Sequence, residues 1–212
     1  WDGDHQPDDI GPTVYYNLLS QLMFLTMKDE LGDVAFKSIM ETSVPKNSYE
    51  NFIRNEQSPW WDDVTTVAKE TRRDIVKYAA GNTLKILHRT CGSSPDEWQW
   101  GKVHTITHGH PLGTVSLFKP FFNVGPISVA GGSEVLNNLS FSLDTTGYFP
   151  VVSGPALRKI TDFARIDQGE TVSPTGQSGN IMSRYYDDQA DMFATGEFRI
   201  MMMNRKEIDK GA

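Results

Sequence analysis

The stretch GPTVYYNLLSQLMFLTMKDELG, residues 11–32, decides how the first half of this chain folds. Apolar side chains recur in it at helical spacing, with polar residues on the other faces: Val14, Tyr15, Leu18, Leu19, Leu22, Met23 and Met27. Gly11-Pro12 is typical of a helix start with proline in the first turn, and Gly32 of a helix end. The stretch therefore predicts an amphipathic helix.

Helical signals continue to about residue 100. We expect further helices over residues 34–40, 49–55 and 69–90, with a connection rich in Ser, Pro and Asn at residues 43–48. Ser58-Pro59 is typical of a capped helix start, and Ser94-Pro95-Asp96-Glu97 matches a capping box, in which serine and glutamate each accept a backbone hydrogen bond.

From Gly101 onward, alternation, β-branched residues and Gly/Pro punctuation replace the helical period. We expect strands over residues 102–108, 127–130, 134–143, 149–154, 159–165 and 197–203. No repeat or low-complexity linker divides the chain. The fold class is therefore predicted as α+β, with residues 1–212 forming one unit: residues 1–100 mainly helical and residues 101–212 mainly strands and loops.

Composition excludes several classes of function. The 212 residues carry a net charge of −7 with Lys and Arg scattered, so nucleic acid is not an expected partner. The apolar runs fall far short of the roughly 18 residues that a membrane span needs. A single cysteine, Cys91, cannot form an internal disulfide and is expected to pack as a small apolar residue. The sequence starts at Trp1 without a signal peptide, so we expect that this N-terminus was made by cleavage or by the choice of segment boundaries.

The stretch HTITHGH, residues 104–110, is a candidate metal site. On a strand, His104, His108 and His110 would share a face, and His108 and His110 could present two imidazoles to one metal ion. His104 would lie about 13 Å from His108, so a site would need distant carboxylates. We favour the alternative, in which these imidazoles bond to loop backbone or pack beside Trp98 and Trp100.

The stretch VSPTGQSGNIMSRYYDDQ, residues 172–189, resembles a hydrolase site. A nucleophile elbow needs Gly-x-Ser-x-Gly, but here the second glycine, Gly179, follows Ser178 directly. Ser178 would also need a base, and only the histidines named above could supply one. We favour a tight loop in which Gln177 and Ser178 bond to the backbone. Asp187 and Asp188 are expected in the first turn of a helix, with Arg184 as a loop or surface charge partner.

Two other motifs give weaker signals. In SGPALRKITDF, residues 153–163, a buried Arg158 paired with Asp162 is possible, but we favour an edge strand or solvated strand face. Gly131-Gly132 lacks the Gly-x-Gly-x-x-Gly pattern, so no nucleotide loop is expected. No cofactor is expected from this segment.

Four stretches together resemble the closing part of the penicillin amidase (penicillin acylase) family. They are DEWQWGKVHTITHGHPLG (residues 96–113), NVGPISVAGGSEVLNN (residues 123–138), SGPALRKITDF (residues 153–163) and, above all, SPTGQSGNIMSRYYDDQADMFATGEF (residues 173–198). WDGD, residues 1–4, resembles the part of the family just upstream. The similarity runs in order through essentially the whole chain.

The resemblance implies an N-terminal-nucleophile hydrolase with an αββα sandwich, made as a precursor that cleaves itself into α and β chains. In that family, the first serine of the β chain attacks the amide, and its own amino group is the base. This segment resembles only the C-terminal part of the β chain. Trp1 has no hydroxyl or thiol, and no position matches the nucleophile or the oxyanion-hole asparagine. Met192-Phe193 departs from the tryptophan that the family often has.

The resemblance therefore implies no catalytic, cofactor-binding or metal residue in this segment, which is expected to be inactive alone. Its implied partners are the rest of the precursor (the α chain and the N-terminal part of the β chain) and a small-molecule amide, in the periplasm or outside the cell. The implied function is the C-terminal structural portion of an amidase acting on β-lactams or related N-acyl compounds. The alternatives are a non-catalytic assembly or binding module and a metal-dependent hydrolase using His108 and His110.

Overall fold

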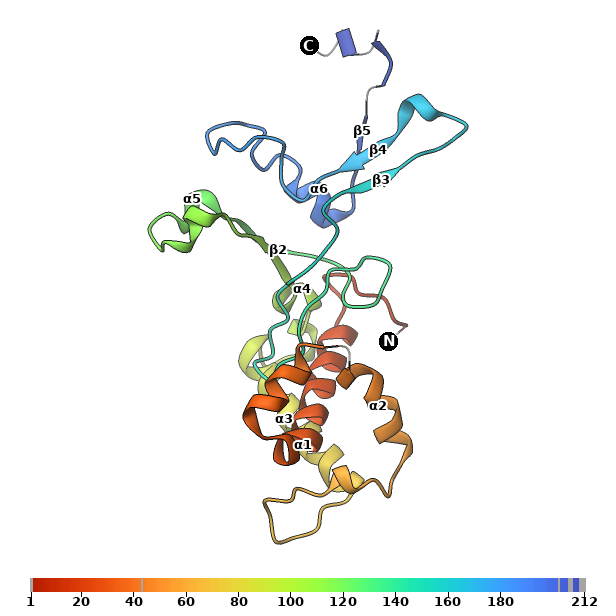
Figure 1. The fold of residues 1–212 in the computed structure, drawn as a ribbon, viewed down its shortest axis with the longest axis vertical. Helices are drawn as coiled ribbons and strands as arrows, with labels where there is room; N and C mark the ends of the chain where they lie inside the picture. The colour runs from red at the N-terminus through yellow and green to blue at the C-terminus, as the bar shows by residue number, and fades with distance from the viewer. Residues whose placement is uncertain (1, 43, 202, 206–207, 210–212) are drawn as a thin grey trace. The chain divides into compact units, whose positions relative to one another are not determined.

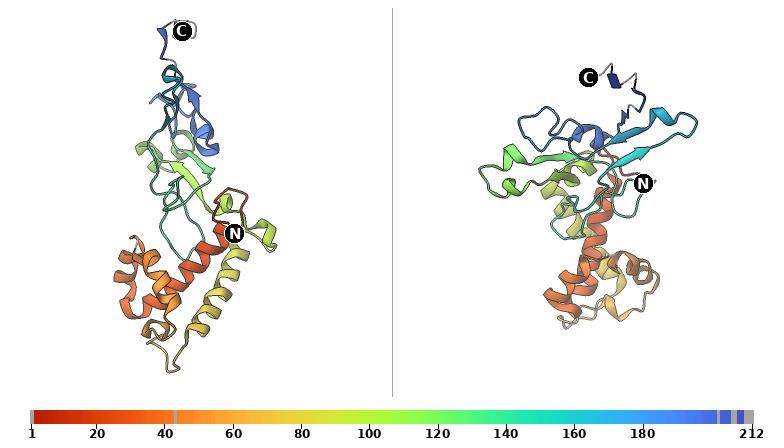
Figure 2. Two further views of the ribbon diagram at one scale, coloured as in Figure 1. Left: turned by 90° about the vertical axis from the view of Figure 1, so that its right-hand side faces the viewer. Right: turned by 45° about the horizontal axis from the view of Figure 1, so that its top comes forward.

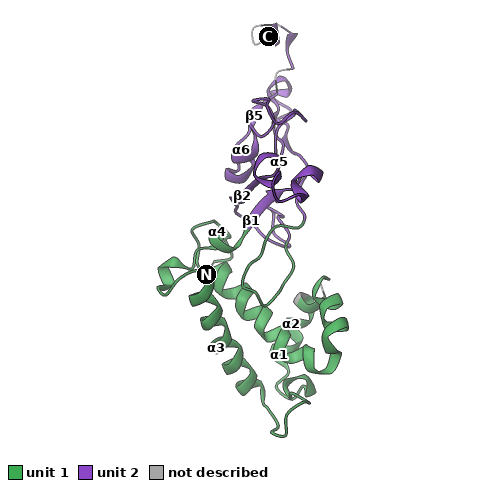
Figure 3. Cartoon of the chain, turned by 90° about the vertical axis from the view of Figure 1, so that its left-hand side faces the viewer, with its two compact units in different colours: residues 1–104, 141–152 green, residues 105–140, 153–212 purple. Residues whose placement is uncertain are grey.

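The computed structural model describes residues 2–42, 44–201, 203–205 and 208–209. It mixes helices with short strands, which confirms the α+β class (Figure 1). The chain divides into two compact units. Unit 1 comprises residues 1–104 and 141–152, and unit 2 comprises residues 105–140 and 153–212 (Figure 3). The predictions of one unit over residues 1–212 and of an αββα sandwich stay predictions.

Unit 1 is built on helices α1 (Gly11–Met40) and α3 (Arg72–Thr90), which lie side by side (Figure 2). The predicted helix at residues 11–32 is confirmed, and Gly32 interrupts α1 with a φ of 70°. Its buried Leu19, Leu22 and Met23 pack with residues of α3 in one core. No helix among the described residues is long and apolar enough to span a bilayer.

Two helix boundaries differ from prediction. Helix α2 (Val44–Arg54) covers most of residues 43–48, where we expected a connection, because the proline lies in the first turn, where its missing N–H costs no helical bond. Ser43 is outside the described residues. Helix α3 begins at Arg72, three residues later than predicted. Thr71 and Asp74 form a capping box there, with the carboxylate accepting from Thr71 N at 3.0 Å.

The capping box at Ser94 is confirmed. Ser94 N donates to Glu97 Oε2 at 2.9 Å, at the start of the 3-10 helix η2 (Pro95–Glu97). Helix α4 (Trp100–Val103) follows, so the first residues of the predicted strand 102–108 are helical. The short 3-10 helix η1 (Pro59–Trp61) occupies the start predicted at Ser58.

The predicted strands at residues 134–143 and 149–154 are wrong. Ser140 and Ser153 make an isolated bridge within unit 2, and the residues between them run irregularly in unit 1. Their aromatic side chains explain the difference, because Phe141 and Phe149 are buried against Trp100 in the helical core. Core packing therefore outweighs the β pattern here.

Unit 2 contains two small antiparallel sheets. Strands β1 (Thr105–His108) and β2 (Val124–Ser128) form one. The second has the order β3-β4-β5, from β3 (Arg158–Ile160), β4 (Glu170–Val172) and β5 (Arg199–Ile200).

The remaining helical turns of unit 2 connect these strands. They are η3 (Pro111–Thr114), α5 (Lys119–Phe122), η4 (Ile166–Gln168) and α6 (Ala190–Thr195). The strands predicted at residues 102–108, 159–165 and 197–203 are thus present in shorter form, and the strand predicted at residues 127–130 lies at Val124–Ser128. Strand β4 was not predicted, because three residues give too short a pattern. Met202, in the predicted strand 197–203, lies outside the described residues.

Candidate functional site

His104 is fully buried in the aromatic core of unit 1. Its Nδ1 donates to the backbone oxygen of Phe149 at 2.7 Å, and its ring stacks on Trp100 with centroids 4.6 Å apart. Burial lowers the pKa of His104 to about 4, because the charged imidazolium would lose its hydration. The favoured prediction, backbone bonding and packing beside a tryptophan, is confirmed for this residue.

His108 and His110 lie in unit 2 in separate surroundings. The His108 ring packs edge-on against Phe193 at 6.3 Å, and burial lowers the pKa of His108. His110 Nδ1 accepts a hydrogen bond from Leu112 N at 3.1 Å and so caps η3. In the described part of the chain, no three His, Cys, Asp or Glu side chains are grouped to hold a metal ion.

Ser178 belongs to an ordered loop over residues 173–189. Its Oγ accepts from Asn180 N at 3.1 Å, and its own N–H donates to Tyr185 O at 3.0 Å. Among the described residues, no hydrogen bond joins Ser178 to a histidine. A serine needs such a base to become a nucleophile. Its observed partners therefore support the tight-loop interpretation.

Close backbone approach explains the glycine at position 176 of this loop. Gly176 N donates to Tyr186 O at 2.9 Å, and a Cβ on Gly176 would lie 2.0 Å from Tyr185 O. At the end of the loop, Gln189 is almost fully buried, and its Oε1 accepts from Ser173 N at 3.0 Å. The loop is thus closed by its own hydrogen bonds.

The charged residues of this loop differ in part from prediction. Asp187 and Asp188 precede α6, which begins at Ala190, so their predicted place in its first turn is wrong; Asp191 occupies that turn. Asp188 instead pairs with Arg199 at 3.8 Å. Arg184 lies over the ring of Tyr185, 4.5 Å from its centroid, and bonds to its hydroxyl.

Arg158 joins separate segments of unit 2 by hydrogen bonds, and the sequence did not reveal this role. Its guanidinium donates to Phe193 O at 2.6 Å and to Asn137 Oδ1 at 2.7 Å, and it lies 3.9 Å from the centroid of the Phe193 ring. The favoured prediction of an edge strand is confirmed, because β3 lies at the edge of the β3-β4-β5 sheet. The alternative, a pair between Arg158 and Asp162, is wrong, because Asp162 pairs with Arg165. The signal was absent because Phe193 and Asn137 are distant in sequence.

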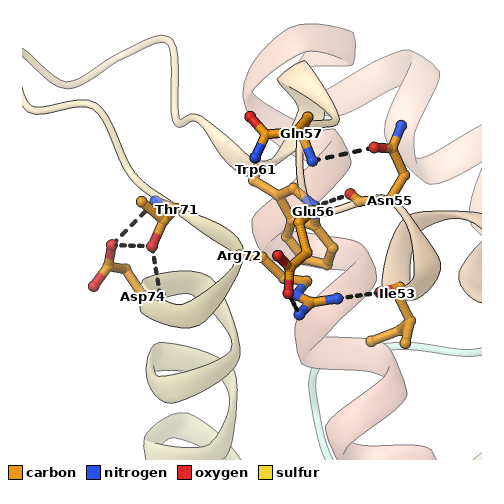
Figure 4. Close-up of polar contacts among 8 residues, drawn as sticks. All are labelled: Ile53, Asn55, Glu56, Gln57, Trp61, Thr71, Arg72 and Asp74. Atoms are coloured by element: carbon orange, nitrogen blue, oxygen red, sulfur yellow. Dashed lines mark hydrogen bonds and ion pairs between the residues drawn. The ribbon is translucent and has the colours of Figure 1, made fainter.

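A cavity of about 830 Å³ lies in unit 1 beside the start of α3, and Figure 4 shows the polar contacts at this place. Arg72 Nη1 donates to Ile53 O at 2.6 Å, and Arg72 also pairs with Glu56. The buried Trp61 donates through Nε1 to Asn55 O at 2.8 Å. These groups hold the end of α2, η1 and α3 together, and no histidine or cysteine lines the cavity.

A smaller hollow of about 370 Å³ is lined by residues of the β3-β4-β5 sheet. Lys159, Thr171 and Arg199 form a cross-strand row there, since Thr171 pairs with both of the other two residues. Arg199 is already paired with Asp188. The hollow contains no acid or base placed against a nucleophile.

Cys91 is another potential nucleophile. It is buried in the core of unit 1, and burial raises the pKa of its thiol. A thiol with a raised pKa is a poor nucleophile, and the expected packing role is confirmed. Neither Cys91 nor Ser178 is thus hydrogen-bonded to a histidine among the described residues. Trp1, the other position considered for this role, is outside them.

Comparison with known proteins gives a match over nearly the whole chain. The family model described as Penicillin amidase matches residues 1–210. Similar proteins include acyl-homoserine lactone acylases QuiP of three pseudomonads. The protein of Pseudomonas syringae pv. tomato is 27% identical over 220 residues, which cover 100% of this chain and 26% of the relative.

The other two relatives have a similar sequence identity to this chain and match over a similar share of their own length. The Pseudomonas fluorescens (strain Pf0-1) protein is 26% identical, over 99% of this chain and 25% of its own length. The Pseudomonas aeruginosa protein is 28% identical, over 86% of this chain and 23% of its own length. The chain therefore spans about a quarter of the length of these curated relatives.

Proposed function

Because the chain belongs to the penicillin amidase family, we propose that it is the C-terminal structural portion of an amidase or acylase. The reaction is hydrolysis of the side-chain amide of a β-lactam or a related N-acyl compound. N-acyl homoserine lactones fall within this substrate class. The names of the similar pseudomonad proteins support these lactones as the first substrates to test.

The single observation that carries this proposal is the extent of the match. The family model covers residues 1–210, while the relatives are about four times as long as this chain. Chemistry that needs a nucleophile then belongs to polypeptide outside these residues. We call the longer polypeptide that would include this chain the parent protein.

The proposed mechanism is amide hydrolysis through an acyl-enzyme. A serine at a newly exposed N-terminus attacks the amide carbonyl, and its own amino group accepts the hydroxyl proton. The amine leaves with that proton, and water then hydrolyses the acyl ester, releasing the carboxylic acid. Residues 1–212 contribute packed framework, which includes Ser178 and His104 in structural roles. We further propose, from the family, that the parent protein works in the periplasm or outside the cell.

The test uses the product of the complete gene. Mass spectrometry of the purified parent protein should show cleavage that exposes an N-terminal serine. Release of the free amine from N-acyl homoserine lactones and from a β-lactam is then measured, with the exposed serine changed to alanine as control. The proposal fails if residues 1–212 alone, free of other subunits, turn over an amide at an enzymatic rate. Fractionation of the cells tests the location.

A further inference from the structure

The connection between β1 and β2, residues 109–123, exposes a concentrated set of large apolar side chains. We call it the hairpin tip; its helical turns are η3 and α5 (Figure 1). Within ten residues it exposes Leu112, Val115, Leu117, Phe118 and Phe121. Leu117 is 72% and Phe121 66% exposed. Single exposed apolar residues are normal, but a contiguous group marks an interaction site.

The hairpin tip is held in shape by hydrogen bonds. Asn123 Oδ1 accepts from His110 N at 3.0 Å, and its amide nitrogen donates to Gly113 O at 3.5 Å. A Cβ on Gly113 would lie 1.8 Å from Asn123 Oδ1, so glycine is needed for this closure. Tyr186 Oη donates to Phe122 O at 2.5 Å and ties the tip to the loop over residues 173–189. Because its backbone is already ordered, binding would cost little conformational entropy.

The chemistry of the tip limits what it can bind. Lys119 is the one Asp, Glu, Lys or Arg residue between residues 109 and 123. Interface cores are rich in aromatic residues and poor in charge, and a few buried anchors carry most of the binding energy. Leu117 and Phe121, the most exposed of the five side chains, are suited to be such anchors. The expected partner surface is therefore an apolar depression.

We propose that the hairpin tip docks into an apolar depression on the part of the parent protein outside residues 1–212. This inference rests on the proposed function, which places these residues in a larger acylase. The similar proteins are about four times as long as this chain, so a relative's remaining length offers ample surface. A partner in the same protein also meets the tip at high effective concentration.

The experiment is site-specific photo-crosslinking in the complete parent protein. Phe121 is replaced by p-benzoylphenylalanine, which keeps a large aromatic group in place. Ser116→p-benzoylphenylalanine is the second variant, because this exposed position in the tip carries no apolar anchor. Val67, a fully exposed residue of unit 1, is the control position. Crosslinked peptides are identified by mass spectrometry after irradiation.

The expected result is a crosslink from position 116 or 121 to peptides outside residues 1–212, with a yield at position 67 on the order of fivefold lower. Crosslinks to the same stretch of a second copy would overturn the proposal, as would crosslinks confined to residues 1–212. Folded protein without a crosslink at either position would also overturn it. Amide hydrolysis is assayed separately: an inactive parent protein with the expected crosslink contradicts the proposed function but not the docking.

Discussion

His104 Nδ1 donates a 2.7 Å hydrogen bond to the backbone oxygen of Phe149, 45 residues further along the chain. This bond fixes residues 141–152 to the end of α4, and a second bond, from Phe149 N to Val103 O at 2.8 Å, reinforces it. The aromatic core of unit 1 closes around this pair, so the neutral form of His104 is part of the folded structure.

The pKa of His104 makes unit 1 sensitive to acid. It falls from an ordinary 6.5 to about 4 in the folded chain, so below pH 6.5 the unfolded chain binds a proton that the folded chain does not. The free energy of unfolding should therefore fall as the pH drops from 6.5 to 4, by about 3 kcal/mol from this residue. Denaturant unfolding at several pH values measures the change.

His104→Asn tests the assignment, since the asparagine amide keeps a donor for Phe149 O but does not titrate. It should be less stable at pH 7, by about 2 kcal/mol for lost packing, yet its stability should depend less on pH. His88→Asn removes an exposed imidazole and serves as control. An unchanged pH dependence in His104→Asn would refute the role of His104.

Arg158→Lys should loosen unit 2. Lysine keeps the positive charge but cannot reach Phe193 O and Asn137 Oδ1 together, so the free energy of unfolding should fall by about 2 kcal/mol. Hydrogen exchange should rise in α6 and around Asn137. Arg165→Lys, at an exposed pair with Asp162, should leave exchange at these sites unchanged. Equal effects of the two variants on hydrogen exchange would show that Arg158 does not hold these segments of unit 2 together.

Two glycines of one loop should respond differently to alanine. A Cβ on Gly176 would lie 2.0 Å from the backbone oxygen of Tyr185, whereas a Cβ on Gly179 would have no neighbour within 4 Å. Gly176→Ala should cost about 2 kcal/mol or more, through displaced backbone. Gly179→Ala should cost nothing. Thermal unfolding and protease cleavage of residues 173–189 measure both, and the prediction is wrong if Gly176→Ala is as stable as Gly179→Ala.

Ser178→Ala should leave amide hydrolysis by the parent protein unchanged within about twofold, because the Ser178 hydroxyl is used to bind Asn180 N. Its removal should cost about 1 kcal/mol of stability. The steady-state rate with an N-acyl homoserine lactone is the measurement. A loss on the order of a thousandfold, as for removal of a nucleophile, would make Ser178 catalytic and contradict the loop interpretation.

Local signals predicted the helical half well. The periodic apolar residues of α1 and the capping box at Ser94 depend on neighbours within one or two turns, so sequence reasoning found both. The start of α3 was missed because Thr71-x-x-Asp74 ends in aspartate, a less familiar form of the same cap. Among the candidate site residues, Ser178 was interpreted correctly because its partner is two residues away.

The sequence by itself determined the helices of unit 1, the α+β class and the membership of the penicillin amidase family, since these depend on local periodicity and on motifs in order. Only the tertiary structure decided the places of Arg158 and His104. Their partners, Phe193 and Phe149, lie 35 and 45 residues away, and no local pattern encodes such a contact. It also decided that Phe141 and Phe149 enter the helical core, because burial of large aromatic side chains outweighs the weak β preference of a short segment.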